Sequence, residues 1–585
     1  MASGSVKKKT IGLILENVFS DFAGEFIRNV LSGIQQRKDL RLVVVAGRYD
    51  GVKDQNEHFR AFHTIYNSAY QLEHRCHFDG LIICLGSMTD ISQEQIQRRF
   101  EDKLKSSPFV FTVTEMKDYV SVNYDNETGI KEALECLINV YGFTRFGMLG
   151  GREDNVDSRY RKEIYSRILN EHGIAFHESD YEATDMSVNT KTEAKALLNR
   201  NPDVQAIFCV NDSVAMGLYE EMADRRLVPG KDIMVFGFDN TKMSGRTIPT
   251  LTSIGADEVT LGKKSLELLL AKMNGEDVKS VRIPTRLYGR ESFPYEMYEY
   301  SRLEMQNIEP AFIYRMFDDC FYRYRYEYIS RESVNLRRLF KEYISKILLA
   351  LRQRYMSVED FEECREMISI FFANGALQYT DADKFLKSVG KLHASVNIAQ
   401  RNNPGGSNEY INRLFSYMRD QAIVALSDEL IKSNEEKVYL RQSYQEFMTQ
   451  ITDYVKETDD PMGRFVSHFD KLGLKNAALY LFDEGVVFEK DNDDLFPEYI
   501  NLRCVTKSGE LYVLPPDRQK CLLREMFERV ELPQVSGFVT FPIFNKWNIY
   551  GFLVCELTPY IATEGEFLAD QLGRLICTSL GGRAI

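Results

Sequence analysis

The chain has 585 residues, of which 44% are hydrophobic and 27% charged, and this composition excludes a mostly disordered protein. The 73 lysines and arginines are outnumbered by 86 aspartates and glutamates, so the net charge of −13 disfavours a broad surface for nucleic acid. No apolar run is long enough to span a membrane, and ten cysteines without a C-x-x-C pair are typical of the reduced thiols of a cytoplasmic protein.

The first half of the chain alternates short apolar runs with amphipathic stretches. Continuous apolar runs predict buried parallel strands at residues 10–15, 42–46, 80–85, 109–113, 146–149, 206–210 and 233–236. Amphipathic segments such as 23–36 and 128–140 predict helices between them. This alternation predicts a doubly wound α/β architecture, and the number of units favours two similar lobes with a cleft between them.

Residues 294–439 have a different pattern, in which glycine is rare and strand-like runs are absent. The apolar spacing predicts an all-α connector with helices at 312–329, 336–355, 358–372, 382–398 and 411–430. A narrow apolar stripe then follows at Leu440, Tyr444, Phe447, Ile451 and Tyr454. Because a monomer would leave this stripe exposed, we expect it to pair two copies of the chain as a homodimer.

Residues 440–585 end the chain with an α+β pattern. The predicted strands are 477–482, 485–488, 509–513, 537–544 and 549–557. Thr563, followed by Glu566, forms a capping-box pattern that predicts the start of a final helix. The segments 539–544 and 549–557 resemble the late hairpin of a GAF domain, and we expect this GAF-like domain to be structural rather than ligand-binding.

Three ordered motifs carry a second resemblance. They are VNDSVAMG at 210–217, VPGKDIMVFGFDN at 228–240 and IPTLTSI at 248–254. Together they resemble the ligand-binding core of the lactose- and purine-repressor family over residues 8–293. The resemblance implies a periplasmic-binding-protein-like fold, whose two α/β lobes close on a small molecule, and it implies no cofactor. The family's helix-turn-helix headpiece has no counterpart before the first strand, so we expect no direct nucleic-acid binding.

The resemblance also implies a set of ligand contacts. By motif match, the family's cleft residues fall on Phe22, Asp125, Arg161, Asn211 and Asp239. Asn211 and Asp239 each follow a predicted strand, and side chains at the carboxyl ends of parallel strands face the cleft. Fixed polar groups against an aromatic wall suit the hydroxyls of a sugar and the edges of a nucleobase equally well.

Several alternatives stay open. Arg159 could serve in place of Arg161, Asp212 could cap a helix, and Phe22 could be a core residue. His74, Cys76 and His77 are closely spaced, but no second pair completes a zinc site, and they are expected on the outer face of the first lobe.

The aromatic and arginine-rich residues between 315 and 328 could stack on nucleic acid, although a packed helix is the better interpretation in an acidic chain. No Ser-His-Asp set, cysteine pair or nucleotide-binding glycine loop is present, so we expect no enzyme.

These observations predict a cytoplasmic regulatory protein that senses a small molecule. The conformational change caused by lobe closure would be transmitted through the connector (294–439) and the GAF-like domain (440–585) to an output domain expected after Ile585. A diguanylate cyclase is one candidate for that output, although no G-G-D-E-F motif occurs. The alternative is a complete transcriptional regulator that acts on DNA or a partner protein through its central helices.

Overall fold

A computed structural model describes most of the chain. The described residues are 8–48, 57–84, 107–113, 119–153, 155–256, 258–294, 310–324, 334–401, 408–452, 466, 468–489, 492, 494–529, 532 and 534–580. They belong to two compact units, Met1–Tyr295 together with Gln442–Ile585, and Glu296–Arg441. Within these ranges, no helix has the length and apolar character that a membrane crossing requires.

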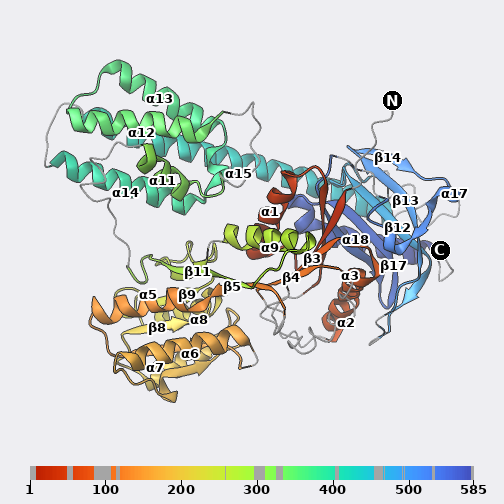
Figure 1. Cartoon of the computed structure of the whole chain (residues 1–585), viewed down its shortest axis with the longest axis horizontal. Helices are drawn as coiled ribbons and strands as arrows, with labels where there is room; N and C mark the ends of the chain where they lie inside the picture. The colour runs from red at the N-terminus through yellow and green to blue at the C-terminus, as the bar shows by residue number, and fades with distance from the viewer. Residues whose placement is uncertain are drawn as a thin grey trace. The chain divides into compact units, whose positions relative to one another are not determined.

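The first lobe is built on a parallel sheet with the strand order β2-β1-β3-β4-β5, of which β3, β4 and β5 are labelled in Figure 1. Its strands are β1 (Lys9–Leu15), β2 (Leu40–Ala46), β3 (Gly80–Cys84), β4 (Phe109–Thr112) and β5 (Ser121–Asp125). Its helices are α1 (Asp21–Gln35), α2 (Glu57–Tyr66), η1 (Asn67–Gln71), α3 (Leu72–Arg75) and α9 (Glu258–Met273). All positions of β1 after Lys9, and every position of β2 and β3, are buried, as expected for strands covered on both faces.

The second lobe has its own sheet, in which β6, β7, β8, β9 and β10 are parallel. The strands are β6 (Phe146–Gly150), β7 (Tyr181–Ala183), β8 (Ala206–Cys209), β9 (Met234–Phe238) and β10 (Thr252–Ala256). The helices are α5 (Asn126–Asn139), α6 (Val156–Glu171), η2 (Glu178–Asp180), α7 (Lys191–Arg200) and α8 (Asp212–Asp224). The predicted two-lobed α/β architecture is therefore confirmed.

One strand joins the two sheets. β11 (Val281–Tyr288) pairs in parallel with β5 through its first half and antiparallel with β10 through its second half. Buried and exposed positions alternate along β11, and β5 ends in partly exposed polar residues. Neither strand has the continuous apolar run on which the sequence prediction relied, which explains why both were missed.

The second unit consists of helices in its described residues. They are α11 (Pro310–Cys320), α12 (Leu336–Gln353), α13 (Val358–Ala373), η3 (Ala376–Tyr379), α14 (Ala382–Arg401) and α15 (Asn408–Thr452), which continues into the other unit. Phe317 and Phe321 stack at 4.9 Å between ring centroids, and Phe371 packs edge-on against Phe321. The aromatic side chains of Phe317, Phe321 and Tyr324 are buried in a core, as the packed interpretation expects. The predicted helix at 312–329 is too long, because α11 ends at Cys320 and residues 321–324 form a bend and turn; residues 325–329 lie outside the described residues.

The C-terminal segment forms an antiparallel sheet with the order β16-β17-β12-β13, in which β14 and β15 both pair with β13. Its elements are β12 (Ala477–Val487), β13 (Tyr499–Lys507), β14 (Glu510–Val513), α17 (Pro516–Gln519), β15 (Lys520–Leu522), η4 (Leu523–Glu525), β16 (Gly537–Asn545), β17 (Asn548–Glu556) and α18 (Pro559–Leu580). Helix α18 packs on β16 and β17.

Helix α18 begins earlier than the capping box predicts. The hydroxyl of Thr558 accepts a hydrogen bond from Ile561 N at 3.1 Å, and Pro559 is the first helical residue. Proline favours this position because its ring fixes φ and it has no N–H to satisfy. Thr563 instead donates to the carbonyl of Pro559 within the helix, so the capping-box assignment is wrong.

The N-terminal and C-terminal segments share a continuous sheet and core. Strand β16 pairs in parallel with β2, with Gly537 opposite Leu42 and Thr540 opposite Val45. Leu42 N also donates to Ser536 O at 2.8 Å. The edge of the first-lobe sheet is therefore covered by the same chain.

This junction also corrects the expectation for the His-Cys-His cluster. Cys76 is buried and its Sγ lies 3.4 Å from Leu523 O, while His77 N donates to Arg524 O at 2.9 Å. The cluster lies against the C-terminal segment and not on an outer face. Among the residues that the structure describes, no group of histidine, cysteine and acidic side chains could hold a metal ion.

The expected dimer stripe is partly covered within the chain. Phe447 is 1% exposed, Tyr444 packs edge-on against Phe567 at 5.5 Å, and the hydroxyls of Tyr444 and Tyr560 form a hydrogen bond. The premise that a monomer exposes this stripe is therefore wrong at Tyr444 and Phe447, and Tyr454 lies outside the described residues.

Candidate functional site

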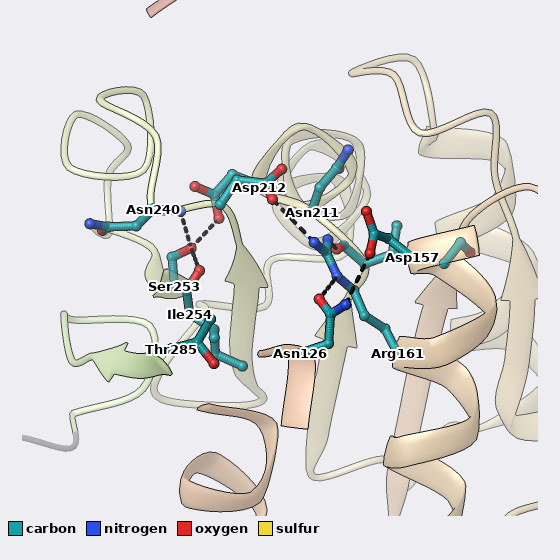
Figure 2. A network of polar contacts seen from close by, with 12 residues as sticks. Asn126, Asp157, Arg161, Asn211, Asp212, Asn240, Ser253, Ile254 and Thr285 are labelled. Carbon is teal, nitrogen blue, oxygen red and sulfur yellow. Dashed lines mark hydrogen bonds and ion pairs between the residues drawn. The ribbon is translucent and has the colours of Figure 1, made fainter. Parts of the chain in front are cut away.

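A polar network at the carboxyl edge of the second-lobe sheet is organised by Arg161, which is 4% exposed (Figure 2). From α6, its Nη1 donates to Val210 O at 2.7 Å and its Nε donates to Asn126 Oδ1 at 3.1 Å. The guanidinium lies 3.5 Å from the ring centroid of Phe238 and forms an ion pair with Asp239 Oδ1 at 3.5 Å. A planar guanidinium with several fixed partners is a rigid support for the carboxylate beside it.

The amide of Asn126 is oriented by two partners. Its Oδ1 accepts from Arg161, and its Nδ2 donates to Asp157 Oδ1 at 2.9 Å. Figure 2 shows Asn126, Asp157 and Arg161 pointing toward one another. Helix α6 is fixed at its start by Asn155, whose side chain accepts from Ser158 N at 2.9 Å.

Asp239 lies in a loop with an unusual backbone. Asp239 and Asn240 have φ values of 95° and 48°, in the left-handed region that Asp and Asn tolerate better than most residues. Asp239 N donates to Ile254 O at 2.8 Å, and Asn240 N donates to Ser253 Oγ at 2.9 Å. The side chain of Asp239 remains 43% exposed. Desolvation raises the pKa of Asp239, with a smaller opposing effect from Arg161.

Asp212 is buried behind this loop and accepts three hydrogen bonds. Ser253 Oγ donates to Oδ1 at 2.6 Å, and Thr241 donates to Oδ2 from its N–H at 2.7 Å and its hydroxyl at 2.9 Å. The pKa of Asp212 is raised to about 7, chiefly by burial and secondly by the nearby carboxylate of Asp239, with the hydrogen bonds from Ser253 and Thr241 acting in the opposite direction. Asp212 thereby ties α8 to the loop that presents Asp239.

Asn211 caps α8 and is held at both ends of its amide. Its Oδ1 accepts from Val214 N at 2.9 Å, and its Nδ2 donates to Met186 O at 3.1 Å. The alternative that Asp212 caps this helix is therefore wrong, because Asp212 is the first helical residue and its carboxylate is turned into the interior. A ligand contact by Asn211 stays a prediction.

The remaining predicted residues occupy different surroundings. Asp125 caps α5, where its carboxylate accepts from Glu127 N at 2.9 Å and also binds the hydroxyl of Thr128. Phe22 lies in the first lobe and stacks on Phe26 with 5.8 Å between ring centroids.

Arg159, the alternative to Arg161, donates to Glu153 O at 2.5 Å and takes no part in the polar contacts described for Arg161. The structure thus brings Arg161 and Asp239 into direct contact and joins Asp125 to them through the adjacent Asn126.

Sequence reasoning missed three members of the network. Asp157 lies one helical turn before Arg161, a spacing that places both on one face of α6. Asn126 directly follows a predicted site residue. Asp212 lies inside a matched motif, but nothing in the motif indicates that its carboxylate turns inward.

Chemically, this edge offers a half-exposed carboxylate, a rigid guanidinium and oriented amides. Such groups recognise hydroxyl and N–H groups of a neutral polar molecule through fixed hydrogen bonds.

Comparison with known proteins is consistent with this geometry. Residues 140–293 match the family model of a periplasmic binding protein-like domain. Catabolite control protein A of Priestia megaterium is 26% identical over 302 residues, which covers 50% of this chain and 84% of that protein. The HTH-type transcriptional regulator MalR of Clostridium butyricum is 25% identical over 287 residues, covering 48% of this chain and 82% of that protein.

Among solved structures, a transcriptional regulator CelR–cellobiose complex is 21% identical, with a TM-score of 0.40, covering 49% of this chain and 86% of that one. The family model therefore matches the part of the chain that forms the second lobe, and about half of the chain is similar to curated relatives such as a transcriptional regulator.

Proposed function

We propose that this chain is a regulatory protein that senses a small polar molecule, a sugar or a nucleobase, with its two-lobed domain. The observation that carries the proposal is the contact between Arg161 and Asp239, in which a buried guanidinium supports a carboxylate that is still open to solvent. A carboxylate held in this way loses little freedom when a ligand hydroxyl or N–H binds it.

The other predicted residues have distinct roles in this proposal. Asn211 presents an amide fixed by its contacts with Val214 and Met186. Phe22 supplies an apolar wall from the first lobe, and Asp125 stands where β5 leads into the second lobe. These predicted residues do not pair a nucleophilic side chain with a general base, which supports a binding protein rather than an enzyme.

The most direct test of sensing is native mass spectrometry of the purified full chain. We expect the chain to carry, or to take up from a panel of mono- and disaccharides and nucleobases, one small molecule per chain. Uptake that is unchanged in Asp239→Ala would contradict this site, and no uptake of any panel member would contradict the proposed ligand class.

We further propose that the protein is a homodimer, through a different surface from the one the sequence indicated. Helix α15 exposes a set of apolar side chains, at fractions from 48% to 70%, that recur in steps of seven: Ile423, Val424, Leu430, Ile431 and Val438. A seven-residue repeat keeps one seam aligned along a helix, so a second copy of α15 is the natural partner.

Two hypotheses for the output stand side by side. In the first, the C-terminal segment is a GAF-like domain that transmits the ligand-induced conformational change to an output domain. No observation favours a diguanylate cyclase as that output. In the second, the chain acts on DNA or a partner protein through its central helices, as would suit relatives that are transcriptional regulators by name. Burial of Phe317 and Phe321 argues against the aromatic run as a nucleic-acid surface.

A titration of the full chain against labelled duplex DNA, repeated at two salt concentrations, separates the two hypotheses. Binding that weakens steeply with salt would favour the second.

A further inference from the structure

Arg48 lies where the first lobe, the sheet junction and the final helix meet. It follows the carboxyl end of β2, and its backbone is fixed by Asn67, whose Oδ1 accepts from Arg48 N at 2.7 Å. Its Nη1 donates to Glu566 Oε2 of α18 at 2.7 Å. Its guanidinium carbon also lies 5.0 Å from the ring centroid of Phe19. One side chain therefore contacts both the first lobe and the final helix.

Phe19 belongs to the short segment between β1 and α1. This segment is shaped by Asn17, whose Oδ1 accepts from Ser20 N at 2.9 Å, and by Ser20, which caps α1. The Phe19 side chain is 48% exposed although it is large and apolar. It lies at the carboxyl edge of the first-lobe sheet, the edge at which doubly wound domains bind ligands.

Helix α18 packs closely against β16. A Cβ added to Gly573 would collide with the carbonyl of Phe544, and one added to Gly565 would collide with the ring of Phe541. Such close approach means that α18 and β16 move together. Because β16 is hydrogen-bonded to β2, the strand that Arg48 follows is part of the same rigid assembly.

The aromatic packing beneath Arg48 adds a second connection. Phe544 of β16 packs against Phe62 at 5.1 Å and edge-on against Tyr66 at 6.3 Å between ring centroids. Both partners belong to α2 of the first lobe. Burial raises the pKa of the Glu566 carboxyl, with Arg48 opposing that effect, and both side chains of this ion pair are partly buried.

We propose that Arg48 couples the segment between β1 and α1 to the final helix α18, so that a conformational change in either one alters the conformation of the other. Through this contact, ligand binding at the first lobe would alter α18 within one compact unit, without involving the central helices. The proposal rests on the proposed function only in taking ligand binding as the event that changes the conformation of the segment. The coupling itself is a property of the chain without ligand.

A second ion pair across the same junction provides a matched control. Arg75 of α3 binds the Asp494 carboxylate and the carbonyl of Phe496. This pair also joins the first lobe to the C-terminal segment, but Arg75 contacts neither Phe19 nor α18 in the described interactions. If the effect were a general loosening of the junction, breaking either pair would produce it, whereas the proposed coupling runs through Arg48 and not through Arg75.

Hydrogen exchange on the full chain, without ligand, tests the proposal with three variants. Coupling between sites typically changes an equilibrium by about fivefold or more. We expect Glu566→Gln to speed exchange at residues 16–20 by about that factor, through Arg48, which is the described partner of the Glu566 side chain. Phe19→Leu should in turn speed exchange in the first turns of α18, and Asp494→Asn should leave both regions unchanged.

Two results would overturn the proposal. The first is that Glu566→Gln changes exchange in α18 only. The second is that Asp494→Asn speeds exchange at residues 16–20 as much as Glu566→Gln does. If Glu566→Gln does not fold, the reciprocal measurement on Phe19→Leu decides, and unchanged exchange in α18 then overturns the coupling. None of these outcomes depends on a ligand, so a failure of the proposed sensing function is distinguishable from a failure of the coupling.

Discussion

Ser253 Oγ donates a 2.6 Å hydrogen bond to Asp212 Oδ1, which joins β10 to the first turn of α8 behind the loop that presents Asp239. The bond is fully buried, and Thr241 occupies the other carboxylate oxygen. The exposed carboxylate of the candidate site is thus supported from behind by a buried one.

Replacing Asp212 by Asn should destabilise the second lobe. An Asn side chain has one acceptor oxygen where the carboxylate has two, so one of the buried donors of Ser253 and Thr241 loses its acceptor at a cost of about 1–3 kcal/mol. We expect the melting temperature of the full chain to fall by several degrees in differential scanning fluorimetry. Asp224→Asn, which breaks an exposed ion pair with Lys191, is the control and should change little. Equal melting temperatures for Asp212→Asn and the control would contradict this role.

The raised pKa of Asp212 predicts a pH dependence. The folded value is about 7 against an ordinary value of 3.8, so the folded state holds this proton more tightly than the unfolded state. Its stabilising contribution is full below the unfolded pKa and is lost as pH rises toward 7. The melting temperature of the wild type minus that of Asp212→Asn should therefore fall between pH 5 and pH 8. A difference that is constant or rises over that interval would show that Asp212 titrates normally.

The β2–β16 pairing predicts that the sensor domain is not stable by itself. Residues 8–294 expressed alone would expose the edge of β2, a strand that is buried at all 7 positions in the full chain. Unpaired apolar edge strands recruit other chains. We expect light scattering to show aggregates for this fragment and not for the full chain. A monodisperse fragment whose β2 amides exchange slowly would mean that the edge is protected without β16.

The seven-residue repeat on α15 predicts the effect of single charges on assembly. Ile431→Glu places a charge in the proposed seam and should convert the dimer to monomers in sedimentation velocity at micromolar concentration. Lys432→Glu is the matched control, because it also adds negative charge but one residue farther round the helix, on an exposed polar position. Dissociation by both variants, or by neither, would contradict pairing through this seam.

Much of the fold of the first half could be predicted from the sequence because its strands are buried on both faces. Strands such as β1, β2 and β8 lie within a residue or two of the predicted runs. β11 could not be found in this way, since its exposed positions interrupt the apolar run. The start of α18 was misplaced because two threonines compete as caps, and only Thr558 is followed by a proline that cannot lie deeper in the helix.

The candidate site was predictable only in part. The strand-end positions of Asn211 and Asp239 follow from the alternation of strands and helices. The partners of Arg161 do not, because Asn126, Val210 and Asp239 reach it from separate elements. Covering of β2 by β16 depends on pairing between residues hundreds of positions apart, such as Leu42 and Gly537, for which the sequence pattern has no local signal.

The central claim is that Asp239, supported by Arg161, binds a small polar molecule. The most direct test is isothermal titration of the full chain with the compound found by native mass spectrometry, comparing wild type, Asp239→Asn and the control Asp224→Asn. Losing one hydrogen-bond partner of a bound ligand costs about 1–3 kcal/mol, so we expect affinity to fall by about 5- to 150-fold for Asp239→Asn and to stay unchanged for the control. Equal affinities in all three proteins would contradict the account.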